Sequence, residues 1–196
     1  MANDIPAHGA PLAACSALGV RAGTPVAPLV EDESLCIVEE PLLAAVSLRQ
    51  YRAQPDSSAL VAALAEFKVA APAQPNAMTG DSRHGAAWIE PHAWLVTALG
   101  DLPVPVPRAG LLVTDVSDRY AALRISGARA RSVIAAGCDP AILAPMRAAR
   151  TRFGGVATAL IQQWGEDDYR VLVDVSLAQT VAAWLRQAAA FSRELS

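Results

Sequence analysis

The sequence predicts an α+β domain built mainly from antiparallel sheets, with three helices. Short runs in which apolar and polar residues alternate are typical of half-buried strands, and turns of hairpin length separate them. Three other segments carry apolar residues at helical spacing. Because strands follow one another through hairpins and helices fall between groups of strands, the order indicates an α+β rather than an α/β protein.

Eight strands are expected. The first alternates apolar Val46 and Leu48 with polar neighbours. Glu90-Pro91 separates two strands of a hairpin, and residues 117–119 join two further strands into a pair. The expected ranges are 45–51, 86–89, 93–97, 111–116, 120–125, 148–153, 156–163 and 169–175.

Three helices are expected between and after these strands. The first spans 58–67, with N-cap candidates at residues 56–58. The second spans 128–136, capped by Ser126-Gly127 and ended by Gly137 in the left-handed conformation. Ser176 caps the last helix. Apolar faces are expected from Leu60, Val61, Leu64 and Phe67 in the first helix and from Leu177, Val181, Trp184, Leu185 and Ala188 in the last.

A chain of 196 residues is long enough for one domain with a substantial core. Residues 1–28 are rich in Ala, Pro and Gly without periodicity, so we expect a flexible or partner-wrapping N-terminal arm. Residues 29–196 are expected to form a single α+β domain. Residues 72–80 are expected to be loop, and the alternating prolines of 103–107 predict an extended crossover.

The composition points to a protein with a partner. Hydrophobic residues make up 53% and charged residues only 18% of the chain, with a mean hydropathy of +0.29. Surplus apolar surface usually lies at an interface. A net charge of −3 argues against general binding of nucleic acid or anionic membranes, since neither polyanion would attract the molecule.

Residues 119–152 are nevertheless basic. The region contains a single acid, Asp139, against seven arginines. Two interpretations stay open, a solvated surface or a docking surface for an acidic partner or ligand. The arginines are Arg119, Arg124, Arg129, Arg131, Arg147, Arg150 and Arg152.

Cysteine usage favours a reducing cytoplasm. Cys15, Cys36 and Cys138 form no CxxC pair and would leave one thiol over in any disulfide scheme. Residues 12–15 resemble the end of a lipoprotein signal, but no basic start or continuous apolar stretch precedes them. The sequence contains no apolar run long enough for a membrane helix.

Three sets of residues are candidates for a metal or catalytic site. His84, Glu90 and His92 contain the ligand types that zinc takes, although a hairpin tip with ordinary polar residues explains them more simply. Cys138 has no base nearby in sequence and fits a small buried cysteine better than a nucleophile. Asp115 and Asp118 flank a turn, where aspartates are common for reasons of turn geometry.

The sequence also lacks the motifs of nucleotide and acyl chemistry. No GxGxxG follows a strand, Gly154-Gly155 is not followed by the Lys-Ser/Thr of a P-loop, and there is no Gly-x-Ser-x-Gly. We therefore expect no catalytic, cofactor-binding or metal-binding residues in this chain.

Several segments between residues 40 and 190 resemble the gamma subunit of heterotetrameric sarcosine oxidase. Residues 76–81 (NAMTGD) and 87–96 (AWIEPHAWLV) are similar to paired elements of that family. Residues 116–130, Ala136-Gly137-Cys138, the strand at Thr151-Arg152 and the closing Trp184-Leu185 helix follow in the family's order.

The resemblance implies a fold like the tetrahydrofolate-binding domain of the glycine-cleavage T-protein. It also implies alpha, beta and delta partner subunits, which would carry FAD, FMN, NAD, tetrahydrofolate and zinc while this chain carries none. The complex would demethylate sarcosine or a related N-methyl amine oxidatively, giving the amine and a one-carbon unit. A non-catalytic structural subunit is the function this implies.

Three departures from the family pattern concern local shape. Glu90 stands where glycine is usual and His92 where an acid is usual. Residues 102–107 replace a segment that is often helical, and Cys138-Asp139-Pro140 alters the order of the acid and the proline. The alternative function is a freestanding folate-binding one-carbon transferase or regulator, for which Asp115 would be the pocket carboxylate.

Overall fold

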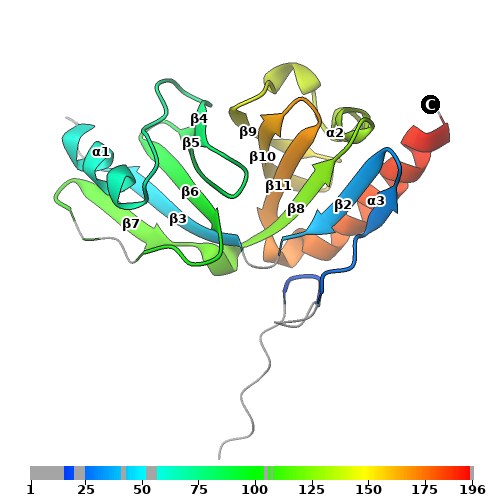
Figure 1. Ribbon diagram of the computed structural model, residues 1–196, viewed down its shortest axis with the longest axis horizontal. Helices are drawn as coiled ribbons and strands as arrows, with labels where there is room; N and C mark the ends of the chain where they lie inside the picture. The colour runs from blue at the N-terminus through cyan, green and yellow to red at the C-terminus, as the bar shows by residue number, and fades with distance from the viewer. Residues whose placement is uncertain are drawn as a thin grey trace, which may run out of the picture.

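The computed structural model describes residues 16–19, 25–40, 43–51, 57–103, 106 and 108–194. These residues form two antiparallel sheets and three α-helices (Figure 1), which confirms the predicted α+β class. None of the described helices is long and apolar enough to cross a membrane.

The larger sheet has six strands in the order β1-β2-β8-β11-β10-β9, and every neighbouring pair is antiparallel. Its strands are β1 (Val30–Asp32), β2 (Leu35–Glu39), β8 (Tyr120–Ser126), β9 (Arg147–Phe153), β10 (Ala157–Gly165) and β11 (Asp168–Asp174). β2 alternates buried and half-buried residues along its length, as a strand does when one face lies against a core.

The smaller sheet has five strands in the order β4-β5-β6-β3-β7, again all antiparallel. They are β3 (Leu43–Gln50), β4 (Met78–Gly80), β5 (His84–Glu90), β6 (Ala93–Leu99) and β7 (Leu111–Asp115). Trp88 and Trp94 lie opposite one another on β5 and β6, with ring centroids 5.3 Å apart. The predicted hairpin with two packed indoles is therefore confirmed.

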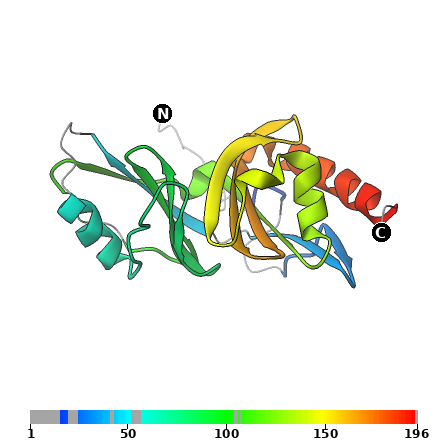
Figure 2. The same ribbon diagram turned by 90° about the horizontal axis from the view of Figure 1, so that it is seen from above.

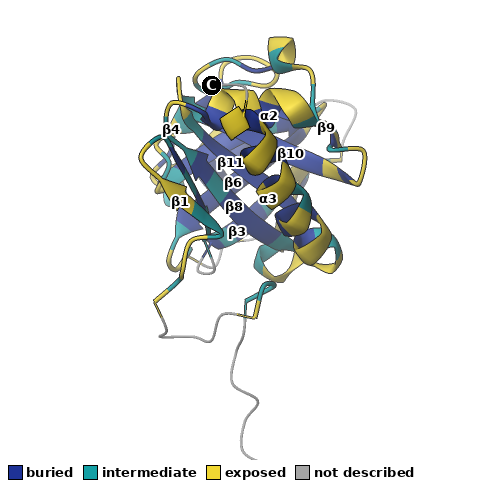
Figure 3. Cartoon of the chain, turned by 90° about the vertical axis from the view of Figure 1, so that its right-hand side faces the viewer, coloured by how far each residue is buried: buried dark blue, intermediate teal, exposed yellow. Residues whose placement is uncertain are grey.

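The two sheets pack against each other and the helices cover their outer faces, as Figure 2 shows from above. Residues of α1 (Ser57–Glu66) pack on the smaller sheet. α2 (Ala130–Gly137) and α3 (Ala178–Glu194) pack on the larger sheet, each with one side buried and the other exposed (Figure 3). The apolar contact between the sheets is formed by Leu43, Ala45, Met78, Ala87, Ile89, Ala93 and Leu95 on one side and Ala122, Ala148, Leu160 and Leu172 on the other.

The predicted pairing of strands 111–116 and 120–125 is wrong. β7 pairs with β3 in the smaller sheet, whereas β8 pairs with β2 and β11 in the larger one. The link between them, the 3₁₀ helix η1 (Ser117–Arg119), carries the chain from one sheet to the other. The Ser117 hydroxyl accepts a bond from the Ala45 amide at 3.0 Å, which holds the link to β3 rather than in a hairpin.

Three short strands were not predicted. β1 and β2 form a hairpin in an acid-rich stretch, and β4 lies within residues 72–80, which were expected to be loop. β4 and β1 have three residues each, too few to show a period of two.

The helix ends also differ from expectation. Gly137 is the last residue of α2 and not a left-handed cap, and Cys138 follows it in an extended conformation. The glycine is needed for packing, because a Cβ there would lie 2.5 Å from the Phe153 ring. α2 begins after Arg129, without a side-chain cap from Ser126.

Further differences lie at the other two helices. Ser176 lies in the 3₁₀ helix η3 (Val175–Leu177), so it does not cap α3, which starts at Ala178. Val61 of α1 is 53% exposed and so does not belong to the apolar face predicted for that helix.

Some predictions concern residues outside the described ranges. Asp56, most of the 103–107 crossover and most of residues 1–28 belong to this group. Among the described N-terminal residues, Ala17 and Leu18 pack against the larger sheet's core, and the Ser16 hydroxyl donates to Glu39 at 2.7 Å. The boundary predicted at residue 28 stays a prediction.

Candidate functional site

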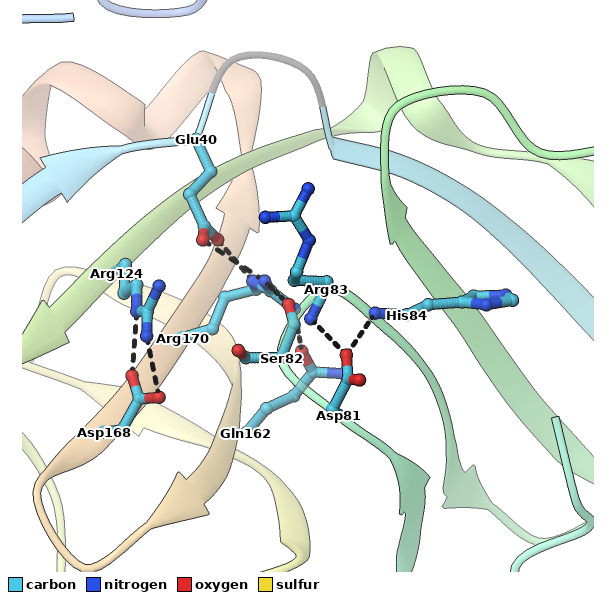
Figure 4. A network of polar contacts seen from close by, with 9 residues as sticks. All are labelled: Glu40, Asp81, Ser82, Arg83, His84, Arg124, Gln162, Asp168 and Arg170. Atoms are coloured by element: carbon cyan, nitrogen blue, oxygen red, sulfur yellow. Dashed lines mark hydrogen bonds and ion pairs between the residues drawn. The ribbon is translucent and has the colours of Figure 1, made fainter.

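The centre of the molecule holds a buried arginine. Arg170 lies in the middle of β11 on the face directed at the smaller sheet and is 1% exposed. Its Nε and Nη2 donate to the Glu40 carboxylate at 2.5 and 3.2 Å, and Nη1 donates to the Gln162 side chain at 3.4 Å (Figure 4). Nη2 also donates to the Ser82 carbonyl of the β4–β5 loop. One side chain therefore ties the larger sheet to a loop of the smaller one.

A second arginine lies beside it. Arg124 on β8 is the direct cross-strand neighbour of Arg170, so two like charges are adjacent. Asp168 accepts two bonds from Arg124, at 2.9 and 3.0 Å. This hydrogen-bonded pairing is the main cause that raises the pKa of Arg124. Each guanidinium thus has its own carboxylate, which offsets the repulsion between them.

The β4–β5 loop is shaped to reach Arg170. The Asp81 carboxylate accepts bonds from the backbone amides of Arg83 and His84 at 2.7 and 2.9 Å, and these bonds lower its pKa. Gly80 has a φ of +89°, and a Cβ there would lie 2.3 Å from the His84 carbonyl oxygen. Gly80 and Asp81 of the NAMTGD segment therefore shape the turn that presents the Ser82 carbonyl to Arg170.

Asn76 of the same segment also has a structural role. It adopts a left-handed φ of +64°, its amide donates to the Trp88 carbonyl at 3.0 Å, and its carbonyl accepts from Ala148 at 2.8 Å. Asparagine tolerates this conformation better than most residues. The segment therefore connects β5 to β9 at one end and reaches Arg170 at the other.

The hydrogen bonds of Arg170 join the larger sheet to the β4–β5 loop. The donors of Arg170 are occupied by protein oxygens, and Trp164 lies beside it with its ring centroid 5.8 Å from the guanidinium carbon. A buried ion pair of this kind costs desolvation energy that its hydrogen bonds must offset, and removing one partner is strongly destabilising. The arrangement links the larger sheet to the β4–β5 loop, and each nitrogen of the Arg170 guanidinium donates to an oxygen of the protein.

Glu90, one of the proposed metal ligands, is instead the partner of two arginines. Its carboxylate oxygens lie 3.0 Å from Arg49 and 3.1 Å from Arg150. Arg49 is on β3 of the same sheet, whereas Arg150 is on β9 of the other sheet. Glu90 thus forms an ionic link between the sheets through Arg150.

The structure does not bring His84, Glu90 and His92 together. His84 and Glu90 are the first and last residues of β5, about 20 Å apart at the usual rise of a strand. The His84 imidazole lines a cavity with Phe67 and Leu102 on the α1 side, while His92 is exposed in the turn with a φ of +59°. Among the residues that the structure describes, no group of three or more His, Cys, Asp or Glu could hold a metal ion.

Cys138 lies at the carboxyl end of α2. Burial, with a smaller contribution from the charge of Asp139, raises the pKa of its thiol from 9.0 to about 11. The thiol donates weakly to the Ile134 carbonyl at 3.7 Å, and the Asp139 carboxylate accepts from the Ala141 amide at the start of η2 (Pro140–Ile142). Cys138 is therefore held in its protonated, poorly nucleophilic form.

Asp115 and Asp118 do not act as a pair. Asp115 accepts bonds from the Ser117 hydroxyl at 2.7 Å and the Ser117 amide at 2.9 Å, which lower its pKa. Asp118 lies in η1 and is exposed. The first carboxylate serves the crossover between the sheets, as an aspartate in a turn does.

Four of the seven arginines in 119–152 pair with acids that lie outside that range. Arg119 pairs with Asp174, Arg124 with Asp168, Arg129 with Asp32 and Arg150 with Glu90. Arg147 and Arg152 contact only backbone carbonyls among the described residues. A count along the sequence could not show these partners, because strand pairing brings them from elsewhere.

Arg170 and Glu40 were missed by sequence reasoning. The signal was present in Tyr169-Arg170-Val171-Leu172-Val173, where a charged residue occupies the same strand face as Leu172. A charge in phase with buried residues of a strand indicates a buried partner. Its partner Glu40 is 130 positions away, so spacing could not identify it.

Two solved structures are similar to this chain. The heterotetrameric sarcosine oxidase from Corynebacterium sp. U-96, in complex with pyrrole 2-carboxylate, is 22% identical with a TM-score of 0.69, and the match covers 84% of this chain and 89% of that chain. The glycine cleavage system aminomethyltransferase T from Bartonella henselae is 13% identical with a TM-score of 0.55, covering 78% of this chain. This chain spans only 45% of that second protein. No family model and no curated protein matches the sequence.

At these identities the likeness shows the fold. The expectation of an α+β fold like the folate-binding domain of the glycine-cleavage T-protein is confirmed.

Proposed function

We propose that this chain is a non-catalytic structural subunit, of gamma type, in a heterotetrameric sarcosine oxidase-like complex. The observation that carries the proposal is the match to a chain of heterotetrameric sarcosine oxidase over 89% of that chain's length. Since the same match covers 84% of this chain, the two chains are similar in size. The complex would oxidatively demethylate sarcosine or a related N-methyl amine to the amine and a one-carbon unit.

The geometry of the centre supports a structural role. A folate-dependent enzyme would need a carboxylate in its folate pocket to orient the pterin and handle a proton. Here Arg170 is bound to Glu40, Gln162 and Ser82, and Asp115 is bound to Ser117. These groups are occupied by the protein itself, which favours a subunit whose partners carry FAD, FMN, NAD, tetrahydrofolate and zinc.

The alternative function is a freestanding folate-binding one-carbon transferase or regulator. The likeness to aminomethyltransferase T favours it, but that match covers less than half of the transferase. We place either protein in the cytoplasm, and the free thiols of Cys36 and Cys138 fit a reducing compartment.

Co-expression with the products of adjacent genes tests the proposal. We expect the chain to purify with alpha, beta and delta partners in a yellow, flavin-containing assembly, and to self-associate or dissolve poorly when made alone. A colourless, well-behaved monomer that binds tetrahydrofolate tightly by titration calorimetry would support the transferase and contradict the subunit role.

Elemental analysis addresses the metal question separately. We expect no stoichiometric zinc in the isolated chain, since its candidate ligands lie apart. Zinc at one equivalent that is lost in His92→Ala would restore the hairpin site.

A further inference from the structure

A groove runs along the open side of β9. It encloses about 630 Å³ and lies between the edge of that strand, the end of β5 and the η2 segment. β9 is the last strand of the larger sheet and lies beside the smaller sheet (Figures 1 and 2). The groove is lined by Asn76, Ile89, residues 141–144, Arg147 and residues 149–151.

The open side of β9 already accepts a short strand-like segment. The Ala148 amide donates to the Asn76 carbonyl at 2.8 Å, and the Met78 amide donates to the Met146 carbonyl at 2.9 Å. Ala77 and Arg147 form the corresponding antiparallel bridge. Pairing stops there, because the Asn76 amide donates to the Trp88 carbonyl and the preceding chain turns at Gln74, whose carbonyl accepts from the Ala77 amide at 3.1 Å.

Beyond that point the edge of β9 has no partner strand among the described residues. In an antiparallel strand the backbone groups of alternate residues point to the same side. Because Ala148 directs its amide outward to Asn76, Arg150 directs its own amide and carbonyl to the same side, where no described strand pairs with them. An extended chain laid in the groove would continue the ladder there.

The side chains around this edge define the chemistry of the occupant. Arg147 has no carboxylate partner among the described residues, and its guanidinium reaches only the Pro75 carbonyl at 3.5 Å. Arg150 shares Glu90 with Arg49, so that trio keeps a net positive charge. Ile89 and Ile142 supply an apolar wall, and Ile142 is 38% exposed.

We propose that this groove docks an extended, acidic segment of a partner subunit as an added strand beside β9. Backbone bonds to Arg150 would hold the segment, a carboxylate would pair with Arg147, and apolar residues on alternate positions would pack against Ile89 and Ile142. The inference rests on the proposed function, since the segment comes from another chain of the complex.

A labelled synthetic peptide in which glutamate alternates with valine tests the binding mode on the full chain. We expect saturable binding by fluorescence anisotropy, and protection of the Arg150 amide in hydrogen exchange when the peptide is bound. The same peptide methylated on alternate backbone nitrogens, or with lysine replacing glutamate, is expected not to bind. Failure of the glutamate peptide to bind, or equal binding of the methylated peptide, would overturn the proposal.

Arg147→Glu tests the charge. Reversing this charge should weaken peptide binding by about tenfold or more. Arg131→Glu, an exposed arginine on α2 outside the groove, is the matched control and should leave affinity unchanged. Equal losses of peptide affinity in both variants would mean that net charge alone causes the effect, and would contradict the docking site.

Two other occupants would also overturn the proposal. Displacement of the peptide by an equal concentration of acetate would identify a site for small carboxylates. Concentration-dependent dimerisation of the unliganded chain, abolished by Arg147→Glu, would identify a contact between copies.

Co-expression separates this inference from the proposed function. If flavin-containing partners purify equally well with the wild type and with Arg147→Glu, the groove is wrong but the subunit role stands. If they purify with neither, the subunit role fails whatever the peptide does.

Discussion

At the residue scale, Arg170–Glu40 is the most deeply buried ion pair among the described residues. Its side chains are 2% and 8% exposed, compared with 51% and 35% for Arg49 and Glu90. Water screens the second pair and not the first, so their contributions to stability should differ.

Substitution of the two glutamates measures this difference. Glu40→Leu leaves Arg170 buried without a carboxylate and should lower the free energy of unfolding by about 3–5 kcal/mol. Glu90→Gln, the exposed control, should cost less than about 1 kcal/mol. Urea denaturation gives both values. Equal, small losses would show that Glu40 does not compensate Arg170.

Cys138 offers a test by pH. A pKa raised to about 11 means that less thiolate is present at pH 8 than for an ordinary cysteine. Alkylation of Cys138 should therefore be slow at pH 8 and accelerate up to about pH 11, assigned by its absence in Cys138→Ser. Because the folded pKa is raised, the linked stability is present below 9.0 and is lost as pH rises towards 11. Rapid alkylation at pH 7 would contradict the buried, protonated thiol.

The residue-level predictions from sequence succeeded where a role is local. The aspartates at turns do what turn chemistry implies, as Asp115 shows with Ser117. Arg170 and Glu40 were missed because each depends on a partner that only the tertiary structure supplies. For the same reason, the arginines of 119–152 looked like one basic cluster.

At the element scale, the turn between β4 and β5 determines whether the smaller sheet reaches Arg170. Gly80 and Gly100 both have positive φ, +89° and +104°. A Cβ at Gly80 would lie 2.3 Å from a carbonyl oxygen, whereas nothing lies within 4 Å of one at Gly100. A Cβ at Gly100 would therefore cause conformational strain alone, whereas a Cβ at Gly80 would also cause a steric clash.

Alanine at each position tests this distinction. Gly100→Ala should cost only the strain of a positive φ, about 1–2 kcal/mol. Gly80→Ala should exceed that loss by at least about 1 kcal/mol, because the carbonyl of His84 must move as well. Thermal unfolding of both variants provides the comparison. Equal losses of stability would mean that the β4–β5 turn adjusts to the added Cβ without disturbing the hydrogen bonds of Arg170.

Strands with seven or more residues were recognisable in the sequence, and both predicted hairpin strands around Glu90-Pro91 were found, whereas the five-residue β2 was missed. The sheet to which a strand belongs was not recognisable. Only residues 116–119 separate β7 from β8, yet the two strands lie in different sheets, because alternation records burial and not the identity of the neighbouring strand.

At the scale of the whole molecule, the two sheets meet through one apolar cluster, the hydrogen bond from Arg170 to the Ser82 carbonyl and the Arg150–Glu90 ion pair. The fold class followed from the order of elements, while the central crosslinks and the open edge of β9 came only from the structure. The polar groups between the sheets bond to one another, so we expect partner subunits to contact the outer surfaces of the domain.

The proposed function makes this chain one subunit of a four-chain oxidase. Native mass spectrometry of the assembly purified after co-expression with adjacent genes tests it most directly. We expect a single complex containing one copy of this chain with the alpha, beta and delta chains, and with flavin in the partners. A flavin-containing complex that assembles without this chain, while the chain stays a monomer, would contradict the subunit role.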